Sequence, residues 1–263
     1  MIQWRDRAVI LSVRSHGETA ALISLLAVEK GLWRGIVPGG RGRSLRPVLQ
    51  PGTEVEAEWS ARLESHLGQF RIEPIKAHGT SLMEDRWALA GMTSVLALAD
   101  RAYQERDPLP QSDGEAGVGA LLTLFGLLDL SRQAEDPLPG GAAIALWERD
   151  LLAMGGFGLD LSRCAVTGLG AADGVVLSHV SPRSGRAVSE GQTGPWLDRL
   201  LPLPPFLAQG SLPTAEEGAN AIHQALSLTG HFLPRVVGEP LPRARVDYAA
   251  RWARQAEANT PQI

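Results

Sequence analysis

Five short segments in the first 76 residues have the pattern of β-strands, and they constrain the fold more than any other feature of the chain. They span residues 7–14, 19–28, 32–37, 53–63 and 69–76. The fourth, TEVEAEWSARL, alternates apolar and polar residues, which is typical of a half-exposed antiparallel strand. Glycine or proline turns separate the segments, and the longest loop, residues 39–52, follows the third.

Five short strands joined mostly by tight turns favour a small closed barrel. A five-stranded OB-fold β-barrel is the best-known solution of this size, and such barrels commonly bind oligonucleotides. An SH3-like barrel fits the same pattern, and the sequence alone does not separate the two. The strand-rich part predicts a first domain over residues 1–79.

From residue 81 the pattern changes to helical periodicity, which predicts an α-helical domain over residues 80–263 and an α+β multidomain fold. Ser81 to Glu84 has the spacing of a capping box and predicts a helix start. Further helices are predicted over residues 115–132 and 142–154, from a second capping box at Thr214 to about residue 229, and over 242–257. Residues 157–192 show no long period and are interpreted as short strands and turns.

Charge is distributed unevenly along the chain. The net charge is −4 over 263 residues, yet the first 80 residues hold 11 basic and 8 acidic side chains, whereas the remainder holds 14 and 21. This asymmetry indicates that an anionic partner would meet the N-terminal part.

The segment from Lys30 to Arg46, KGLWRGIVPGGRGRSLR, is the strongest candidate for that contact, because it contains five basic residues and no acidic one. A cationic loop beside an aromatic residue on a β scaffold can hold a polyanion and stack on a base. We therefore predict a DNA-binding set that also includes Arg14 of the first strand. The set is Arg14, Lys30, Trp33, Arg34, Arg41, Arg43 and Arg46.

Each member of this set has a plainer interpretation. The basic residues can form an ordinary solvated loop, and Trp33 can face the barrel core together with residues 35 and 37. Arginines of the last predicted helix offer a second DNA-contacting or partner face, although Arg243, Asp247 and Arg251 have the spacing of surface ion pairs.

Several function classes find no support. One cysteine, Cys164, cannot form a disulfide within the chain or a thiolate metal site, and we expect no metal and no cofactor. Cys164 with His179 and Asp160 lacks an activating motif, and the loop PGGRGRS lacks the lysine of a nucleotide-binding loop. The apolar run 119–128 is about half the length of a membrane span. We therefore expect a non-enzymatic cytoplasmic protein without membrane contact.

Four segments are distinctive in combination, namely VRSHGET, GLWRGIVPGGRGRSLRPVLQPG, GFGLDLSRCAVTG and VSPRSGRAVS. Together they resemble the RecO family of bacterial recombination mediators, in its alphaproteobacterial form. The resemblance covers residues 2–255. It implies an N-terminal OB barrel, a helical domain and a small finger-like insertion at about residues 157–192.

The resemblance also implies a function in DNA repair and recombination. Such a protein binds single- and double-stranded DNA, anneals complementary strands, works with RecR, and contacts the C-terminal tail of the single-strand-binding protein SSB so that RecA can load. This implies a nucleoid-associated protein. Four arginines near the predicted helices are candidates for the basic rim of an SSB groove: Arg86, Arg101, Arg106 and Arg132. The alternative is a non-catalytic protein–protein adaptor whose barrel is only a scaffold.

The finger-like insertion departs from the zinc-binding pattern of some family members. Those members carry two CxxC pairs, whereas here only Cys164 is present and residue 167 is Thr. A structural zinc needs four ligands. We therefore expect a zinc-less finger with a core of apolar residues, namely Leu159, Leu161, Val166, Val175, Val176 and Val180.

Overall fold

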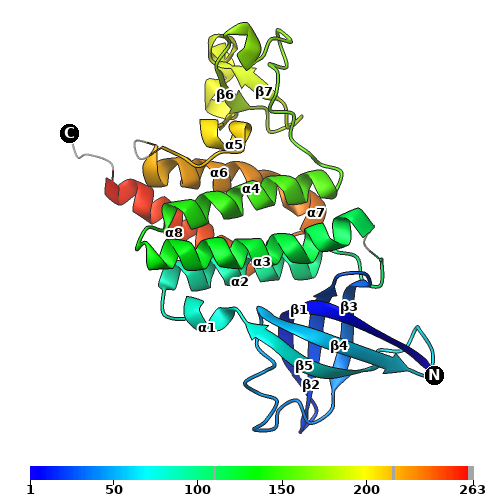
Figure 1. Ribbon diagram of the computed structural model, residues 1–263. Helices are drawn as coiled ribbons and strands as arrows, with labels where there is room; N and C mark the ends of the chain where they lie inside the picture. Colours follow the sequence, from blue (N-terminus) through cyan, green and yellow to red (C-terminus); the bar gives the residue numbers. More distant parts are fainter. Residues whose placement is uncertain (109–110, 215–216, 260–263) are drawn as a thin grey trace. The chain divides into compact units, whose positions relative to one another are not determined.

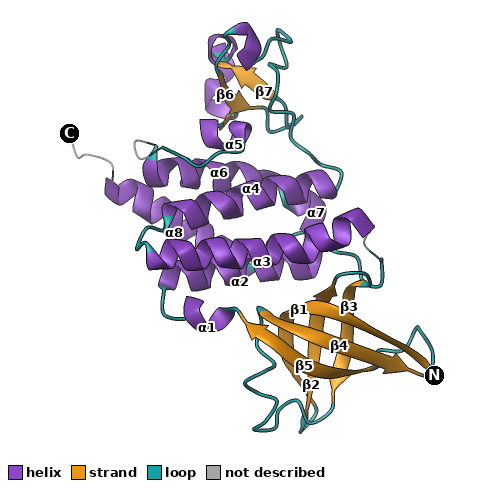
Figure 2. Ribbon diagram, viewed as in Figure 1, coloured by secondary structure: helices purple, strands orange, loops and turns teal. Residues whose placement is uncertain are grey.

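The computed structural model describes residues 1–108, 111–214 and 217–259, and these form two compact units, Met1–Gln133 and Ala134–Ile263. The first unit contains a β-barrel and three helices, and the second contains five helices and a small sheet (Figures 1 and 2). The predicted boundary after residue 79 stays a prediction. The second and third helices belong to the same compact unit as the barrel.

The barrel is closed, with the strand order β1-β2-β3-β5-β4. Its strands are β1 (Ile2–His16), β2 (Ala20–Ala27), β3 (Gly31–Val37), β4 (Thr53–Ala61) and β5 (Gln69–Ala77). All neighbours pair antiparallel except β3 and β5, which meet in parallel at Ile36 and Gln69. The five predicted strands are confirmed, and the fold is OB-like rather than SH3-like. β1 begins five residues earlier than predicted because residues 2–6 pair with β4.

Alternation along the strands puts one face of each into the barrel. Trp33, Trp59 and Phe70 are nearly inaccessible there, and the Trp33 and Trp59 ring centroids lie 4.7 Å apart. Gly35 is required by this packing, because a Cβ at residue 35 would lie 2.6 Å from the Phe70 ring. Burying such large aromatic side chains supplies much of the hydrophobic stabilisation of a small barrel.

Three helices follow in the first unit: α1 (Gly79–Leu82), α2 (Arg86–Ala102) and α3 (Gln111–Gln133). The predicted capping box at Ser81–Glu84 is wrong. Ser81 lies inside α1, and the α2 N-cap is Asp85, whose Oδ1 accepts hydrogen bonds from the backbone N–H groups of Trp87 and Ala88 at 2.8 and 2.7 Å. Asp85 can reach these N–H groups because it directly precedes the first residue of α2, whereas Ser81 lies five positions before that residue.

The second unit contains five helices, three short 3₁₀ turns and a three-stranded sheet. The helices are α4 (Leu138–Met154), α5 (Pro205–Gln209), α6 (Gly218–Phe232), α7 (Pro234–Val237) and α8 (Arg243–Asn259). The strands are β6 (Leu177–Val180), β7 (Ala187–Ser189) and β8 (Leu201–Pro202), in the order β7-β6-β8, and the 3₁₀ turns are η1 (Ala171–Asp173), η2 (Glu190–Gln192) and η3 (Gly194–Arg199).

α4 begins four residues earlier than predicted, so Gly140 and Gly141 lie in its first turns. Pro139 is tolerated there because the first turn of a helix lacks N–H partners. Gly141 allows close helix packing, since a Cβ at this position would lie 2.5 Å from the Trp252 ring of α8. The reciprocal bonds of the second predicted capping box are present: the Glu217 carboxylate accepts from the Thr214 N–H, and the Thr214 hydroxyl accepts from the Glu217 N–H. α6 itself begins at Gly218, four residues after Thr214, with Glu217 at its N-cap.

The finger-like segment is built around the small sheet, but its core differs from the prediction. Val180 is fully buried as expected, whereas Val166 and Val176 are 65% and 64% exposed. Their places are taken by Cys164, Ala187 and other small residues, which are buried instead. Short strands carry too few residues for alternation to reveal which side chains face inward.

Among the described residues, every helix is too short or too polar to cross a membrane.

Candidate nucleic-acid interface

The loop between β3 and β4, residues 38–52, is a series of tight turns that packs against one end of the barrel. Successive backbone bonds shape it, from Gly42 N–H to Gly39 O at 2.8 Å and from Arg46 N–H to Gly42 O at 3.0 Å. Leu49 is buried in the barrel core, and the half-buried Leu45 packs against the same core. The apolar residues face inward, so the arginines between them face outward. We call residues 38–52 the basic loop.

Arg41 attaches the basic loop to the turn between β1 and β2. Its backbone N–H donates to the Thr19 carbonyl, and its Nη1 donates to the carbonyls of Gly17 and Glu18 at 3.1 and 3.0 Å. These acceptors are neutral and Arg41 remains exposed, so its positive charge is not compensated. The loop geometry is therefore fixed while the charge stays available to a ligand.

Arg43 and Arg46 are also exposed. Within the described part of the chain, no carboxylate lies within 4.0 Å of the guanidinium groups of Arg41, Arg43 or Arg46. The sequence prediction of a cationic loop is consistent with this placement. Three uncompensated guanidinium groups at one end of a barrel form a region of positive potential that favours anions.

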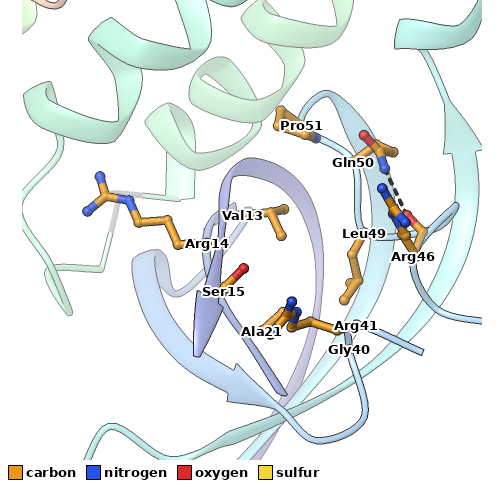
Figure 3. A pocket seen from close by; sticks show the side chains of 10 residues that line it. All are labelled: Val13, Arg14, Ser15, Ala21, Gly40, Arg41, Arg46, Leu49, Gln50 and Pro51. Carbon is orange, nitrogen blue, oxygen red and sulfur yellow. Dashed lines mark hydrogen bonds between the residues drawn. The ribbon is translucent and has the colours of Figure 1, made fainter. Parts of the chain in front are cut away.

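A pocket of about 410 Å³ opens between the basic loop and the first two strands (Figure 3). It is lined by Val13, Arg14, Ser15, Ala21, Gly40, Arg41, Arg46, Leu49, Gln50 and Pro51. No acidic residue lines it. Val13 and Ser15 lie on the same face of β1 as the inward residues of β2, because Ser15 pairs with Ala21 and Val13 with Ile23. The pocket is therefore the open mouth of the barrel interior, and we call it the mouth pocket.

Arg14 joins the mouth pocket only at its edge. It lies between Val13 and Ser15 on β1, so alternation directs its side chain to the outer face of the barrel. In Figure 3 this side chain extends away from Arg41 and Arg46. Arg14 is exposed and has no ion-pair partner among the described residues.

Arg34 is held by the first helical elements rather than presented to a ligand. Its guanidinium pairs with Asp100 of α2 at 3.1 Å and with Glu105 at 2.6 Å. The same Asp100 accepts a hydrogen bond from the Ser24 hydroxyl at 2.5 Å. Two carboxylates therefore compensate the charge of Arg34, and its predicted contact with DNA stays a prediction.

Trp33 lies in the barrel core with 5% of its surface exposed, so its expected use as a stacking platform is not compatible with this structure. The indole N–H donates to the Lys30 carbonyl at 2.8 Å, and the Arg106 guanidinium lies 5.1 Å from the ring centroid. Trp33 therefore faces the barrel core, which was the alternative to base stacking in the sequence analysis.

Lys30 lies at the opposite end of β3 from the basic loop. It occupies the turn between β2 and β3, where its backbone N–H donates to the Asp6 carboxylate at 3.1 Å. Burial raises the pKa of Asp6, while backbone hydrogen bonds act in the opposite direction. Seven residues of β3 separate the two turns, which corresponds to roughly 20 Å. Lys30 therefore does not share a site with the arginines of the mouth pocket.

Arginines at the start of β1 and on the last helix are paired. Arg5 contacts Glu56 at 2.9 Å and Glu73 at 3.3 Å, and Arg243 contacts Asp247 at 3.5 Å, as the spacing on the last helix predicted. The acidic residues of β4 and β5 thus compensate the basic residues at the start of β1.

Two candidates for the basic rim of a partner groove also have contacts. Arg132 pairs with Asp129 at 3.0 Å and Glu84 at 3.9 Å, and Arg106 donates to the His66 carbonyl at 2.8 Å. Arg86 lies 6.0 Å from the Trp87 ring centroid. Whether these side chains contact a partner stays a prediction.

The cysteine, histidine and aspartate considered as a nucleophilic set each bond to other residues. Cys164 Sγ accepts from the Ser189 N–H and hydroxyl, both at 3.3 Å. Asp160 bonds to Ser162, and His179 Nδ1 lies 2.9 Å from the Ser178 hydroxyl oxygen. Burial lowers the pKa of His179. Across the described ranges, no group of three His, Cys, Asp or Glu side chains has the arrangement of a metal site.

Sequence reasoning missed the neutral part of the mouth pocket. Ser15, Leu49 and Gln50 line it, yet none of them carries a charge, and Ser15 lies 34 positions before Leu49. The one available signal was strand register, because Ser15 and Ala21 meet across a tight turn. Only closure of the barrel brings them to the basic loop.

The fold defines the class of protein as a five-stranded OB-like barrel followed by a helical region, with an arginine-rich loop at one barrel end. A family model described as "Recombination protein O N terminal" matches residues 1–78, and one described as "Recombination protein O C terminal" matches residues 83–245.

Relatives named DNA repair protein RecO match over nearly their whole length. The protein of Cereibacter sphaeroides is 42% identical over 258 residues, covering 95% of this chain and 100% of the relative. That of Rhodospirillum rubrum is 43% identical over 266 residues, covering 98% and 100%. That of Dinoroseobacter shibae is 41% identical over 253 residues, covering 94% and 97%. The chain belongs to the RecO family.

Proposed function

We propose that this protein is a DNA-binding recombination mediator of DNA repair, and that the basic loop is its principal DNA contact. It binds single- and double-stranded DNA, anneals complementary strands and, with RecR, helps RecA load onto strands covered by SSB. The observation that supports this most directly is the set of exposed, uncompensated arginines at residues 41, 43 and 46 in a chain of the RecO family.

The mechanism follows from charge. Two DNA strands repel each other through their phosphates, and a cationic surface that neutralises part of that charge lets them approach. The Arg41 guanidinium is oriented by two backbone carbonyls, so ordering it on a phosphate costs less side-chain entropy than ordering a free arginine. The protein acts without a catalytic step, a cofactor or a metal, and its DNA substrate places it at the cytoplasmic nucleoid.

Contact with the acidic C-terminal tail of SSB belongs to the same proposal. An acidic tail is repelled by the phosphates of DNA and attracted by a cationic surface, so the mediator would hold SSB through its tail while the basic loop contacts the strand. Helical residues beyond the barrel are the candidates for this contact. Arg86 is the first to test, because it is exposed and no carboxylate of the described residues lies within 4.0 Å of it.

The decisive experiment is annealing of complementary strands coated with SSB, with and without RecR. The wild type is compared with a variant carrying Arg41→Gln, Arg43→Gln and Arg46→Gln. For single strands, each lost phosphate contact reduces the slope of log affinity against log salt by about 0.7, so the slope should become shallower by about 2. Annealing should slow in parallel.

The matched control neutralises three arginines of α8, namely Arg243, Arg251 and Arg254, which changes the net charge equally. We expect it to keep the wild-type salt slope. Wild-type protein that binds RecR or SSB but no oligonucleotide would instead support the adaptor function.

A further inference from the structure

We propose that the mouth pocket receives one unstacked nucleotide of a single DNA strand, with the base on the apolar floor and its flanking phosphates on Arg41 and Arg46. This inference rests on the proposed function and specifies which form of DNA the barrel end recognises. It predicts that the barrel end binds single strands and duplex DNA in different ways, whereas contacts to phosphate charge alone would not distinguish them.

The floor of the mouth pocket is apolar and is built from the barrel interior. Val13 comes from β1, Ala21 from β2 and Leu49 from the basic loop, and the last two are 2% and 3% exposed. A recess of about 410 Å³ at a barrel mouth, with an apolar floor and a polar rim, is the usual form of a small-molecule site. A planar base can cover such a floor, whereas a phosphate alone gains nothing from it.

The recess depends on the absence of a side chain at residue 40. A Cβ on Gly40 would lie 2.8 Å from the Ala21 Cβ and 2.9 Å from a Leu49 methyl carbon. The loop backbone therefore lies directly on the barrel, and the Gly40 N–H donates to the Val37 carbonyl at 3.1 Å. The floor is consequently rigid before any ligand binds, which reduces the entropy lost on binding.

The rim carries charge on the loop side and neutral donors elsewhere. Arg41 and Arg46 line it without a carboxylate partner among the described residues. Gln50 Nε2 is held by the Arg46 carbonyl at 2.8 Å, which leaves its side-chain oxygen as an acceptor. The Ser15 hydroxyl adds one further donor or acceptor. Two cations beside an apolar floor match a base with a phosphate on either side.

Duplex DNA cannot use this floor. Its bases are paired and stacked, so it presents only phosphate and sugar to a recess, and it would contact the rim arginines alone. A single strand has free base faces. The barrel tryptophans at residues 33 and 59 are in the core, so within the described barrel the base is held by aliphatic contact, which favours no particular sequence.

The test measures binding of three ligands of about 12 nucleotides: a single strand of thymidines, the same sugar-phosphate strand without bases, and a duplex. The full-length protein is compared with Ser15→Leu, which fills the pocket without changing its charge. The matched control is Ser227→Leu, which adds the same side chain to an exposed position of α6, outside both the basic loop and the pocket lining. Thermal melts establish that both variants fold.

We expect the wild type to bind the thymidine strand about fivefold more tightly than the strand without bases, a scale set by burial of a modest apolar area. Ser15→Leu should remove this difference and leave duplex affinity unchanged, and Ser227→Leu should behave as wild type. A strand carrying 2-aminopurine, whose fluorescence rises when the base unstacks, should brighten on binding wild type and less on binding Ser15→Leu.

Equal affinity for the two single strands, or an unchanged preference in Ser15→Leu, overturns the inference while leaving DNA binding by the basic loop intact. A wild type that binds none of the three ligands overturns the proposed function itself. The two failures are thus distinguishable in one set of titrations.

Discussion

The Arg34 guanidinium of β3 donates hydrogen bonds to both the side-chain Oδ1 and the backbone carbonyl of Asp100 in α2, each at 3.1 Å. The contact joins the outer face of the barrel to the helix that follows it in the same compact unit. An arginine within a cationic segment therefore stabilises the fold, whereas its neighbours in the basic loop remain uncompensated.

Substitution of Arg34 is expected to affect stability more than DNA binding. Arg34→Ala removes two ion pairs and leaves the partly buried Asp100 carboxylate without its strongest donor, which should lower the free energy of unfolding by about 1–2 kcal/mol. Urea titration measures this. Arg43→Ala serves as control and should change stability by less than about 0.5 kcal/mol. A tenfold loss of DNA affinity at unchanged stability would show that Arg34 contacts DNA.

Trp33 should likewise behave as a core residue. Trp33→Ala creates a cavity beside Trp59 and removes the surface under the Arg106 guanidinium, so we expect a loss of about 3–5 kcal/mol in unfolding free energy. Trp33→Phe should cost less, about 1–3 kcal/mol, and keep wild-type affinity for single strands. Weak DNA binding by a Trp33→Phe protein of normal stability would contradict the core assignment.

The strands were predictable because their alternation and turns are local, and so was the cationic character of the basic loop. The partner of Arg34 was not, since Asp100 lies 66 positions away and is one of many acidic residues. Ser81 and Asp85 show the same limit at short range: both have cap chemistry, and packing of α2 decides which one caps it.

The candidate site was predictable only in its charges. Arg41, Arg43 and Arg46 are consecutive features of one loop, whereas Val13 and Leu49 become neighbours only when the barrel closes. The cationic pattern of the sequence also includes Lys30, but the length of β3 separates Lys30 from the arginines of the basic loop. Sequence proximity and spatial proximity differ wherever a strand intervenes.

A buried ion pair in the second unit gives a prediction independent of DNA. Arg245 and Glu148 are 2% and 0% exposed in their side chains, and Arg245 Nη2 lies 2.9 Å from Glu148 Oε2. The Thr229 hydroxyl donates to the same carboxylate, and the Leu226 carbonyl accepts from Arg245 at 2.6 Å.

Breaking this pair from one side leaves an uncompensated buried charge. Arg245→Met should therefore destabilise the fold by about 3–5 kcal/mol, measured by urea unfolding. The double variant Arg245→Met with Glu148→Leu should recover most of that loss, since neither charge remains. A double variant no more stable than Arg245→Met alone would indicate that the pair is needed for packing rather than for charge balance.

The finger-like segment is expected to fold without zinc. Cys164 is its one thiol, and the residue that bonds to its Sγ is Ser189 rather than a further zinc ligand. Elemental analysis of purified protein should find far less than one zinc per chain, and a chelator should leave the melting temperature unchanged. Stoichiometric zinc that is lost together with structure on chelation would refute this.

The Cys164 thiol should make stability depend on pH in a defined window. Burial raises its pKa, but hydrogen bonds from the Ser189 hydroxyl and backbone, and from the backbones of Thr167 and Val166, outweigh burial and lower the pKa to about 6 from an ordinary 9.0. Between these values the unfolded chain binds more protons than the folded one, so the stability contributed by the thiolate rises with pH. It is complete above the ordinary value and is lost as pH falls through about 6.

Unfolding free energies of wild type and Cys164→Ala at pH 6, 7, 8 and 9 test this, because contributions of other groups cancel in the difference. The wild-type advantage should widen across this window by at most about 1.4 kcal/mol per pH unit. Cys164→Ser, which keeps a polar atom but does not ionise, should show no such widening. A constant difference between wild type and Cys164→Ala would mean that the thiol stays protonated despite its four donors, and that burial outweighs them.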